Sequence, residues 1–471
     1  TALARWRVPM PAAGGRVVLH YGGHFDFGLS DESEQYTRGF RQTIGIVSKE
    51  GVYLAGDGYW YPQLNRALIG TRVSVSMPDG WQVIAPGNGR ARDTDGQARW
   101  NVEGGLDELT FVGGPLLEYR EKAGAIDALV YLRTKDDALA AKYLEATAQY
   151  LKMYEDLIGP YPYGKFAMVE NFWETGYGMP SYTLLGPQII RFPFILTSSY
   201  PHEILHNWWG NSVFVAYESG NWCEGLTAYM ADHLIQEQRG RGAEYRRDAL
   251  QKYRNYVRDG HDLPLTAFRS RHSAATEAVG YGKALMVFHM LRQRVGDDAF
   301  RRWVRAFDER YRGKQASWAD VESVFESVSG LDLTRFFSDH VTHVGAAVLQ
   351  PERVAVREVA GGFEVTGTLV QAQKGAALEL HVPVLVQTAA GNATDTVHTV
   401  TARTAFTIRT KARPLALHVD PAADVFRLLD PRELRQHPLP RRRVVTARAV
   451  REARPQEQLI VERVVDQEIT D

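Results

Sequence analysis

The chain has 471 residues, of which 44% are hydrophobic and 24% are charged. This is an ordinary globular composition, and the length suffices for about three domains. The 55 Lys and Arg residues are balanced by 56 Asp and Glu residues, whereas nucleic-acid-binding proteins usually carry a basic excess. We therefore expect no nucleic-acid partner. Cys223 is the single cysteine, which excludes an intramolecular disulfide and a metal cluster built from several cysteines.

The sequence also predicts a soluble chain without a transmembrane segment. A membrane-spanning helix needs about 18–20 uncharged apolar residues in a row. The most apolar stretch, residues 182–197, is interrupted by Gly186, Pro187 and Arg191. The sequence starts at Thr1, so it does not decide between the cytoplasm and, after removal of a signal peptide, the periplasm or the exterior. The oligomeric state is also left open.

Residues 1–132 have the pattern of an N-terminal β-domain. Short runs of alternating polarity, such as residues 16–20, 72–77 and 109–112, lie between turn signals such as Pro78-Asp79-Gly80. Runs of this length with such punctuation are typical of short strands.

The middle of the chain changes to helical patterns. From Asp136 the apolar residues recur at helical spacing, and Gly159-Pro160 ends this run. Short strand patterns follow over residues 160–197. Further helical patterns then occupy residues 243–257, 284–295, 298–311 and 318–328. Together these patterns predict a mixed α/β domain over residues 133–347.

Alternation of polar and apolar residues returns after Gly345. Runs over residues 354–356, 363–369, 378–386 and 405–408 predict a small β-sandwich over residues 348–430. Residues 431–471 form an arginine-rich tail, which we interpret as a solvated segment in preference to a polyanion-binding site. The predicted fold class is therefore multidomain α+β, with an N-terminal β-domain, a mixed α/β domain and a C-terminal β-sandwich.

The strongest chemical signal is the motif His202-Glu203-Ile204-Leu205-His206. Residues four apart on a helix project from one face, so both imidazoles can reach a single cation. Ser198 or Ser199 would cap this helix. Zn²⁺ suits two neutral imidazoles and a carboxylate, with a fourth position left for water. Glu203 is then the expected general base, because a glutamate between two such histidines can accept a proton from that water.

A second motif, Asn221-Trp222-Cys223-Glu224, offers the carboxylate. The same spacing fits a helix start in which Asn221 and Glu224 form a capping box. Both interpretations place a helix here, but the carboxylate of Glu224 can act either as a helix cap or as a metal ligand, and not as both. We interpret Glu224 as the third metal ligand, because a site with two histidines needs another protein group.

These motifs resemble the gluzincin aminopeptidases, a family that includes membrane alanyl aminopeptidase and leukotriene hydrolase. The resemblance rests on residues 202–211 and 222–225 and on the run from Tyr281-Gly282-Lys283 to Leu291, and it extends from about Tyr53 to Leu429. It implies a thermolysin-like catalytic domain.

The resemblance also implies roles for individual residues. One zinc ion per chain would be held by His202, His206 and Glu224, with Glu203 as the general base. Tyr281 would donate its hydroxyl to the oxyanion of the tetrahedral intermediate, and losing such a donor typically costs about 2.7–4 kcal/mol in the transition state.

The sequence departs from the family pattern at two points. The 17 residues between His206 and Glu224 are one fewer than is usual, which a shorter loop accommodates. The family motif Gly-Ala-Met-Glu-Asn is also altered, because the corresponding stretch ends in Gly178-Met179-Pro180-Ser181. The glutamate that binds the α-amine of the substrate in the family is therefore missing.

Two neighbouring carboxylates, Glu170 and Glu174, are the candidates to replace that glutamate, because a buried ammonium group needs a partner. Gly178 and Met179 would offer backbone groups to the substrate, and Tyr182–Leu185 is the expected edge strand with which the substrate pairs.

The expected activity is zinc-dependent hydrolysis of a peptide substrate from its N-terminus. The altered amine motif leaves two further protease activities open, an endopeptidase and a protease specialised for the maturation of one peptide. A non-peptide hydrolase also stays open, because the family scaffold is known to host epoxide hydrolysis. A binding scaffold without activity is disfavoured, since such a protein has no need of Glu203 and Tyr281 together.

Overall fold

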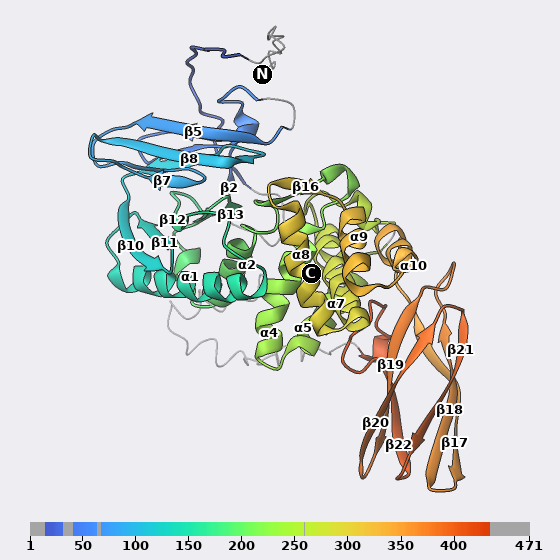
Figure 1. Cartoon of the computed structure of the whole chain (residues 1–471). Helices are drawn as coiled ribbons and strands as arrows, with labels where there is room; N and C mark the ends of the chain where they lie inside the picture. Colours follow the sequence, from blue (N-terminus) through green and yellow to red (C-terminus); the bar gives the residue numbers. More distant parts are fainter. Residues whose placement is uncertain (1–14, 32–40, 64–66, 259, 434–471) are drawn as a thin grey trace, which may run out of the picture. The chain divides into compact units, whose positions relative to one another are not determined.

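The computed structural model describes residues 15–31, 41–63, 67–258 and 260–433 (Figure 1). By its internal contacts the chain divides into one unit over Thr1–Leu428 and a second over Leu429–Asp471. The described elements lie in the first unit, apart from one helical turn over Pro431–Glu433. The expected domain limits near residues 132 and 347 stay predictions, and most of the expected tail, residues 434–471, lies outside the described part of the chain.

Two small antiparallel sheets form the N-terminal part. The first has the order β3-β4-β9-β6 and contains β3 (Gly45–Val47), β4 (Val52–Leu54), β6 (Gln82–Ile84) and β9 (Phe111–Gly114). The second has the order β5-β8-β7 and contains β5 (Ile69–Ser76), β7 (Asn88–Arg90) and β8 (Gln97–Leu106). A short pair joins β1 (Ser30–Asp31) to β2 (Arg41–Gln42). The β-rich character of this region is confirmed, but the strand expected over residues 16–20 is wrong, because that segment is irregular.

A five-stranded mixed sheet follows, in the order β10-β11-β12-β14-β13. Its strands are β10 (Leu117–Ala123), β11 (Ile126–Leu132), β12 (Lys165–Glu170), β13 (Gly176–Met179) and β14 (Tyr182–Leu185). Strand β12 is parallel to β11 and β14, whereas β13 pairs antiparallel with β14 at the edge. The expectation that Tyr182–Leu185 is the edge strand is therefore wrong, because β14 is paired on both sides and β13 is the edge.

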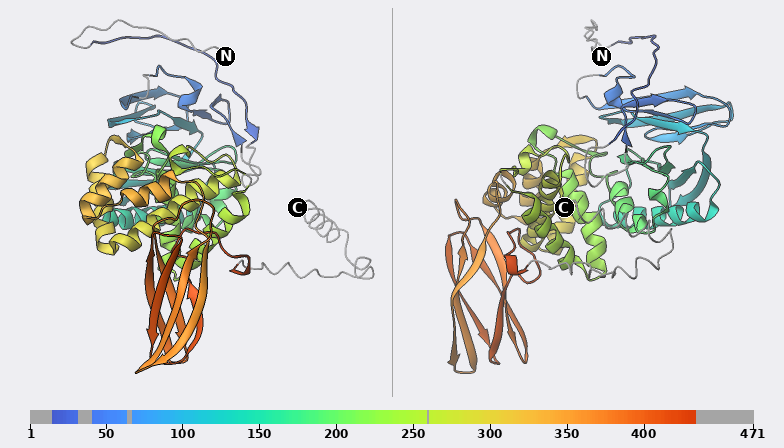
Figure 2. Two further views of the ribbon diagram at one scale, coloured as in Figure 1. Left: turned by 90° about the vertical axis from the view of Figure 1, so that its right-hand side faces the viewer. Right: turned by 180° about the vertical axis from the view of Figure 1, so that it is seen from behind.

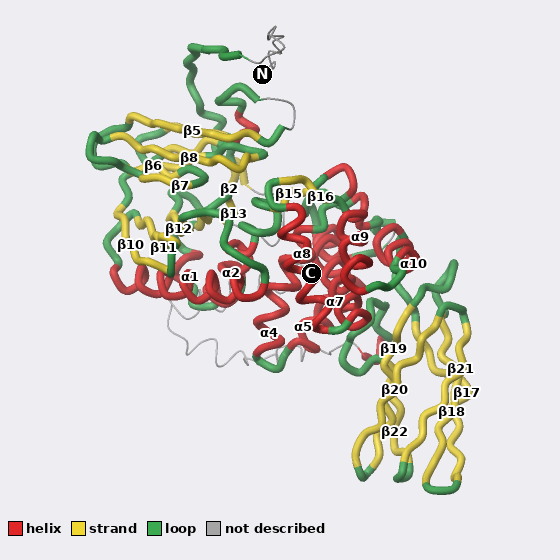
Figure 3. The backbone as a smooth tube through the Cα atoms, in the orientation of Figure 1, coloured by secondary structure: helices red, strands yellow, loops and turns green. Residues whose placement is uncertain are grey.

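Helix α1 (Asp137–Leu157) covers this sheet and packs on β10 and β11 (Figure 3). Its start is set by Asp136, whose carboxylate accepts a hydrogen bond from Leu139 N at 3.0 Å. Its apolar face is buried and includes Tyr143, Tyr150 and Tyr154. The helix predicted from the spacing after Asp136 is thus confirmed.

The remaining helices build the central, mostly helical part of the first unit (Figure 1). They are α2 (Ser199–Leu205), α3 (Cys223–Thr227), α4 (Leu234–Gln238), α5 (Gly242–Tyr256), α6 (Ala274–Glu277), α7 (Ala284–Val295), α8 (Asp297–Tyr311), α9 (Trp318–Ser329) and α10 (Thr334–Phe337). A π-helical segment, Ala228–His233, joins α3 to α4, and a second, Ala278–Lys283, joins α6 to α7. A third, Ser338–Thr342, follows α10. Strands β15 (Val213–Val215) and β16 (Lys314–Ala316) form a short parallel pair beside them.

Two three-stranded sheets end the first unit, drawn in orange and red in Figure 2. One contains β17 (Leu349–Val359), β18 (Gly362–Gln371) and β21 (Arg403–Thr410), and the other β19 (Leu380–Thr388), β20 (Gly391–Thr399) and β22 (Pro414–Val419). Alternate side chains of both sheets, such as Val365 and Val384, are buried, as expected for two layers that share a core. Among the described residues, no helix is both long enough and apolar enough to cross a membrane.

Candidate active site

The histidine motif lies on and just after helix α2. His202 and Glu203 belong to the helix, and His206 is its C-terminal cap. Ser198 occupies the N-cap position, but its hydroxyl donates to the Phe194 carbonyl at 2.9 Å and caps no helix N–H. The prediction that a serine side chain caps the helix is therefore wrong, although the helix starts where it was expected. Helix α2 packs against β13 and β14, which brings the motif to the edge of the sheet.

Three ligand atoms converge at this edge. His202 Nε2 lies 3.1 Å from His206 Nε2. Glu224 Oε2 lies 3.6 Å from the first nitrogen and 3.5 Å from the second. In a tetrahedral site with bonds of about 2.0–2.2 Å, neighbouring ligand atoms are roughly 3.3–3.5 Å apart. His202, His206 and Glu224 thus form a group able to hold a metal ion.

The other ring nitrogens orient the two imidazoles. His202 Nδ1 lies 2.9 Å from Asp232 Oδ2, and His206 Nδ1 lies 3.0 Å from the carbonyl oxygen of Trp209. Both partners are acceptors, so each Nδ1 carries the hydrogen and each Nε2 is left to bind a cation. Two Nε2 atoms 3.1 Å apart repel each other if both are bare or both protonated, and a shared cation removes this conflict.

Glu224 provides independent evidence that these three residues fit a metal ion. Its Oε2 atom is buried and lacks a hydrogen-bond partner within the described part of the chain. A buried carboxylate oxygen without a hydrogen-bond partner is costly, because it has lost its hydrogen bonds to water and made none in their place. A cation held with the two imidazoles would satisfy it. The capping-box alternative does not hold, because Trp222 is the N-cap of α3 and Glu224 caps no N–H of that helix.

Asp232 is a site residue that the sequence analysis missed. It lies in the π-helical segment Ala228–His233, eight residues after Glu224. In an α-helix a residue eight positions on is rotated away by about 80°, but one extra residue in the π-turn brings it back to the face of Glu224. The π-turn therefore allows one helical run to supply both a candidate ligand and the carboxylate that orients another.

Glu203 lies against strand β13. A Cβ atom added to Gly178 would lie 2.2 Å from Glu203 Oε2, so a larger residue at this position would displace the carboxylate. Burial raises the pKa of Glu203, and the imidazoles of His206 and His202 offset this only in part. Glu203 is thus a carboxylate suited to accepting a proton, beside the backbone of the exposed strand edge.

Tyr281 completes the group around the two histidines. Its ring lies 6.3 Å from the His202 ring, centroid to centroid, and the two rings are stacked. Burial and the nearby carboxylate of Glu224 raise the pKa of Tyr281. Its hydroxyl therefore stays protonated and able to donate a hydrogen bond. Tyr281 lies inside the continuous helical run from Ala274 to Val295.

The charges around the imidazoles favour a cation. Burial lowers the pKa of His202, but Asp232 and Glu224 outweigh it and raise this pKa to about 10. Burial raises the pKa of Glu224, yet His206 and His202 hold it well below its usual value. The carboxylates thus stabilise positive charge at the Nε2 atoms, and a divalent ion supplies that charge in place of protons.

All these groups line one cavity of about 1100 Å³. Its wall also contains Gly178 and Met179 of β13, and two acidic residues that were not predicted from the sequence, Asp107 and Glu108. Thr110, which follows them, contacts Met179 Sδ through its hydroxyl at 3.6 Å. Asp107 and Glu108 therefore lie close in sequence to Thr110, the residue that contacts strand β13.

Glu170 and Glu174 do not line this cavity. Glu170 is buried, with Oε1 3.0 Å from Arg191 and Oε2 accepting from Arg133 N at 2.8 Å. Glu174 Oε1 accepts a hydrogen bond from Gln188 N at 2.8 Å. The structure does not bring either glutamate to the two histidines, and their predicted role as amine anchor stays a prediction.

The comparisons with known proteins point to one family. Residues 196–340 match the model of the peptidase family M1 domain. This segment of the chain is similar to the peptidase family M1 domain. The resemblance to gluzincin aminopeptidases is therefore confirmed over the segment that contains His202, Glu203, Glu224 and Tyr281.

Curated relatives are similar over parts of their length. Aminopeptidase 2 of Candida albicans is 19% identical over 347 residues, which cover 64% of this chain and 35% of that protein. Human aminopeptidase RNPEPL1 is 27% identical over 188 residues, 36% of this chain and 26% of that protein. Aminopeptidase N of Lactococcus lactis is 24% identical over 169 residues, 32% of this chain and 19% of that protein. The chain thus spans about a third or less of the length of these relatives.

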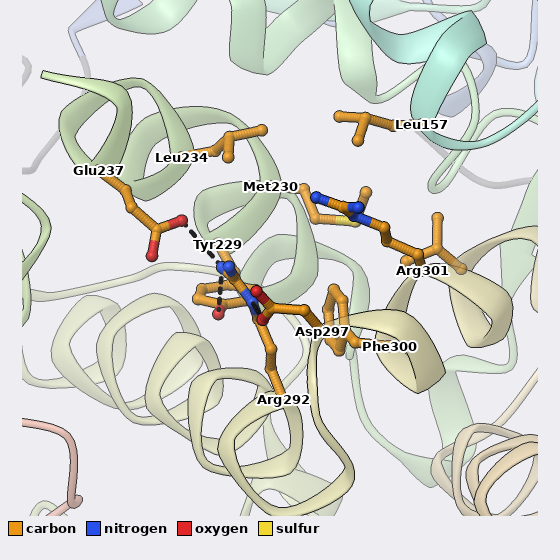
Figure 4. Close-up of a pocket in the computed structure, with 10 residues that line it drawn as sticks. Leu157, Tyr229, Met230, Leu234, Glu237, Arg292, Asp297, Phe300 and Arg301 are labelled. Atoms are coloured by element: carbon orange, nitrogen blue, oxygen red, sulfur yellow. Dashed lines mark hydrogen bonds and ion pairs between the residues drawn. The ribbon is translucent and has the colours of Figure 1, made fainter.

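A smaller cavity of about 90 Å³ lies elsewhere among the helices, partly lined by Tyr229, Met230 and Phe300 (Figure 4). Arg292 crosses it and pairs with Glu237 and Asp297. Both acidic residues of this lining are thus engaged by Arg292, and the lining includes no metal-ligating group like that of the large cavity.

A second group of possible metal ligands lies at the C-terminal sheets, outside residues 196–340. It consists of Glu379, His381 and His398. Arg294 donates to Glu379 and lies 3.2 Å from His381 Nε2. The positive charge of a guanidinium group at this position repels a metal ion. The group of His202, His206 and Glu224, near Glu203, is therefore the stronger candidate metal site among the described residues.

The hydrogen bond between His202 and Asp232 predicts a measurable effect on the metal. We expect Asp232→Asn to weaken metal binding by about 10–100-fold, because an amide orients the imidazole less well and makes it a weaker ligand. Metal affinity would be measured by competition with a chromogenic chelator. The control is Asp156→Asn, at an exposed position of α1. An affinity within twofold of the unmodified protein would contradict this role.

Proposed function

We propose that this chain is a zinc-dependent metallopeptidase with a thermolysin-like catalytic domain, and that it releases N-terminal residues from peptides. The observation that carries the proposal is the convergence of His202 Nε2, His206 Nε2 and Glu224 Oε2 beside Glu203 in one large cavity. The donor set of two imidazoles and one carboxylate is the one that catalytic zinc sites use. The family match and the names of the relatives support the same class of enzyme.

The catalytic steps follow from the groups around the metal site. A zinc ion held there supplies a Lewis acid that polarises a peptide carbonyl and makes water acidic near neutral pH. Glu203 accepts the proton from the attacking water and passes it to the leaving amine. Tyr281 donates its hydroxyl to the oxygen on which negative charge develops, so its protonated state is the useful one.

Strand β13 gives the peptide a place to bind. It is the edge of the five-stranded sheet, so it presents backbone groups with which an extended peptide pairs. Gly178 lies directly against Glu203. A peptide on this edge therefore brings its backbone close to the general base.

The substrate's α-amine needs a carboxylate, and Asp107 and Glu108 are the ones we assign to it. Both line the cavity, whereas Glu170 and Glu174 do not. Burial raises the pKa of both Asp107 and Glu108, so each gains stability from a bound ammonium group.

An endopeptidase is the second candidate. Two observations favour it. Pro180 stands where the family has the amine-binding glutamate, and neither Glu170 nor Glu174 reaches the cavity wall. An enzyme without an amine anchor would accept blocked or internal peptide segments.

The two candidates are separated by comparing a free amino-acid p-nitroanilide with its N-acetylated form. We expect the zinc-loaded protein to show a kcat/KM at least 100-fold higher for the free amine, because a site built for a polar group strongly rejects the analogue that lacks it. Asp107→Asn should reduce this ratio, while Asp79→Asn, on an exposed turn, should not. Preference for the acetylated substrate would contradict the aminopeptidase proposal and favour the endopeptidase.

A further inference from the structure

Two phenylalanine rings stand exposed on the wall of the proposed catalytic cavity. Phe192 is 46% exposed and Phe194 is 59% exposed. Their rings are stacked, with centroids 5.5 Å apart and an interplanar angle of 14°. Both line the cavity together with Ile189 and Ile195. These four residues are called the aromatic shelf.

The backbone of the shelf is held in place by buried side chains of α1. Tyr143 donates its hydroxyl to the Ile190 carbonyl at 3.0 Å. Tyr150 donates its hydroxyl to the Leu196 carbonyl at 2.7 Å. Each hydrogen bond ties a carbonyl of the shelf segment to a helix that packs on the sheet. The rings are thus exposed on a backbone that is fixed before any ligand binds.

An ion pair fixes the same segment from the sheet side. Arg191, between the shelf residues, lies 3.0 Å from Glu170, which is only 3% exposed. Glu170 also accepts a hydrogen bond from Arg133 N. Because the guanidinium group is engaged by a buried carboxylate, the cavity side of this segment is left to the apolar side chains.

The shelf is joined directly to the metal-site helix. The Phe194 carbonyl accepts a hydrogen bond from Ser198, the N-cap residue of α2. Ser199, the first residue of α2, lines the same cavity as Phe194 and His202. The distance between the shelf and the catalytic residues is thus fixed by one short segment of chain.

An exposed and stacked aromatic pair on a rigid backbone has the properties of a binding subsite. Single exposed apolar residues are common, but a contiguous apolar patch in a cavity marks a place where a ligand binds. Large apolar side chains that cover the rings would remove apolar surface from water, and aromatic ones would also gain ring contacts. A prearranged backbone lowers the entropy lost on binding.

We propose that the aromatic shelf is the subsite that selects a large apolar or aromatic side chain of the peptide substrate. The proposal rests on the proposed peptidase function, and it names the class of peptide that this site prefers. The shelf offers no charged group to a basic or acidic side chain, whereas the acidic pair assigned to the α-amine, Asp107 and Glu108, belongs to a different segment.

The test measures binding without turnover. The zinc-loaded Glu203→Gln protein would be titrated by calorimetry with alanine-based peptides that carry one phenylalanine at each position in turn. We expect phenylalanine at one position to lower Kd at least tenfold relative to alanine. Adding Phe194→Ala or Phe192→Ala should reduce this ratio below twofold. The matched control is Leu415→Ala, an exposed apolar residue of β22, which should keep the tenfold ratio.

The proposal is overturned if no position shows a tenfold preference, or if both phenylalanine variants keep it. Failure of the peptidase function has a different signature. In that case the unmodified zinc-loaded protein cleaves none of the peptides, while the binding preference and its loss in the variants are still observed with Glu203→Gln.

Discussion

Glutamine in place of Glu203 is expected to lower kcat for peptide hydrolysis by about 10²–10⁴-fold while the protein keeps its metal. The amide has almost the shape of the carboxylate, but it cannot accept the proton of the attacking water. Glu203 is not among the grouped ligand atoms of His202, His206 and Glu224, so metal content should not change. The measurement is kcat/KM and kcat on a free-amine substrate together with metal analysis of the same sample.

The control for this change is Glu145→Gln, an exposed glutamate of α1, which should leave kcat within twofold. Two results would contradict the assigned role. One is a Glu203→Gln protein that retains more than about a tenth of the activity, and the other is a protein that loses the metal together with the activity. The second result would make Glu203 a ligand instead of a base.

Replacing His202 with alanine is expected to remove the metal and with it all zinc-dependent turnover. The change deletes one of three ligand atoms that lie within 3.1–3.6 Å of each other. It also leaves Asp232 without the imidazole that it orients. Because two protein ligands hold zinc far more weakly than three, dialysis should leave the variant with almost no metal.

The comparison variant is His418→Ala, because His418 is an exposed histidine of β22. It should keep about one metal ion per chain and full activity. A His202→Ala protein that still holds one metal ion per chain after dialysis would show that the ion binds elsewhere, for instance at Glu379, His381 and His398.

The parts of the site that lie on regular α-helix could be predicted from the sequence. The pair His202 and His206 needs only a spacing of four residues, and the structure places their Nε2 atoms 3.1 Å apart. Helix α1 was predictable in the same way, from its apolar period and from the cap at Asp136.

Irregular geometry hid other parts of the site. Asp232 reaches His202 only because a π-turn adds one residue to the helix after Glu224, and no sequence period signals such a turn. Tyr281 lies in a second π-helical segment. Its position was inferred from the family resemblance and not from its spacing.

Pairing between distant segments was the other source of error. The strand at Tyr182–Leu185 was expected at the edge because its sequence follows the altered motif. In the structure the chain reverses at Pro180-Ser181, and the preceding strand β13 becomes the edge. Glu170 was one of two candidates for the amine anchor, and this role stays a prediction. In the structure Glu170 pairs with Arg191, which is 21 residues away along the chain.

The most direct test of the account is anomalous X-ray diffraction at the zinc absorption edge, from crystals of the zinc-loaded protein. We predict one strong peak per chain, about 2.0–2.2 Å from His202 Nε2, His206 Nε2 and a carboxylate oxygen of Glu224. A peak at Glu379, His381 and His398 alone, or no peak beside His202, would contradict it.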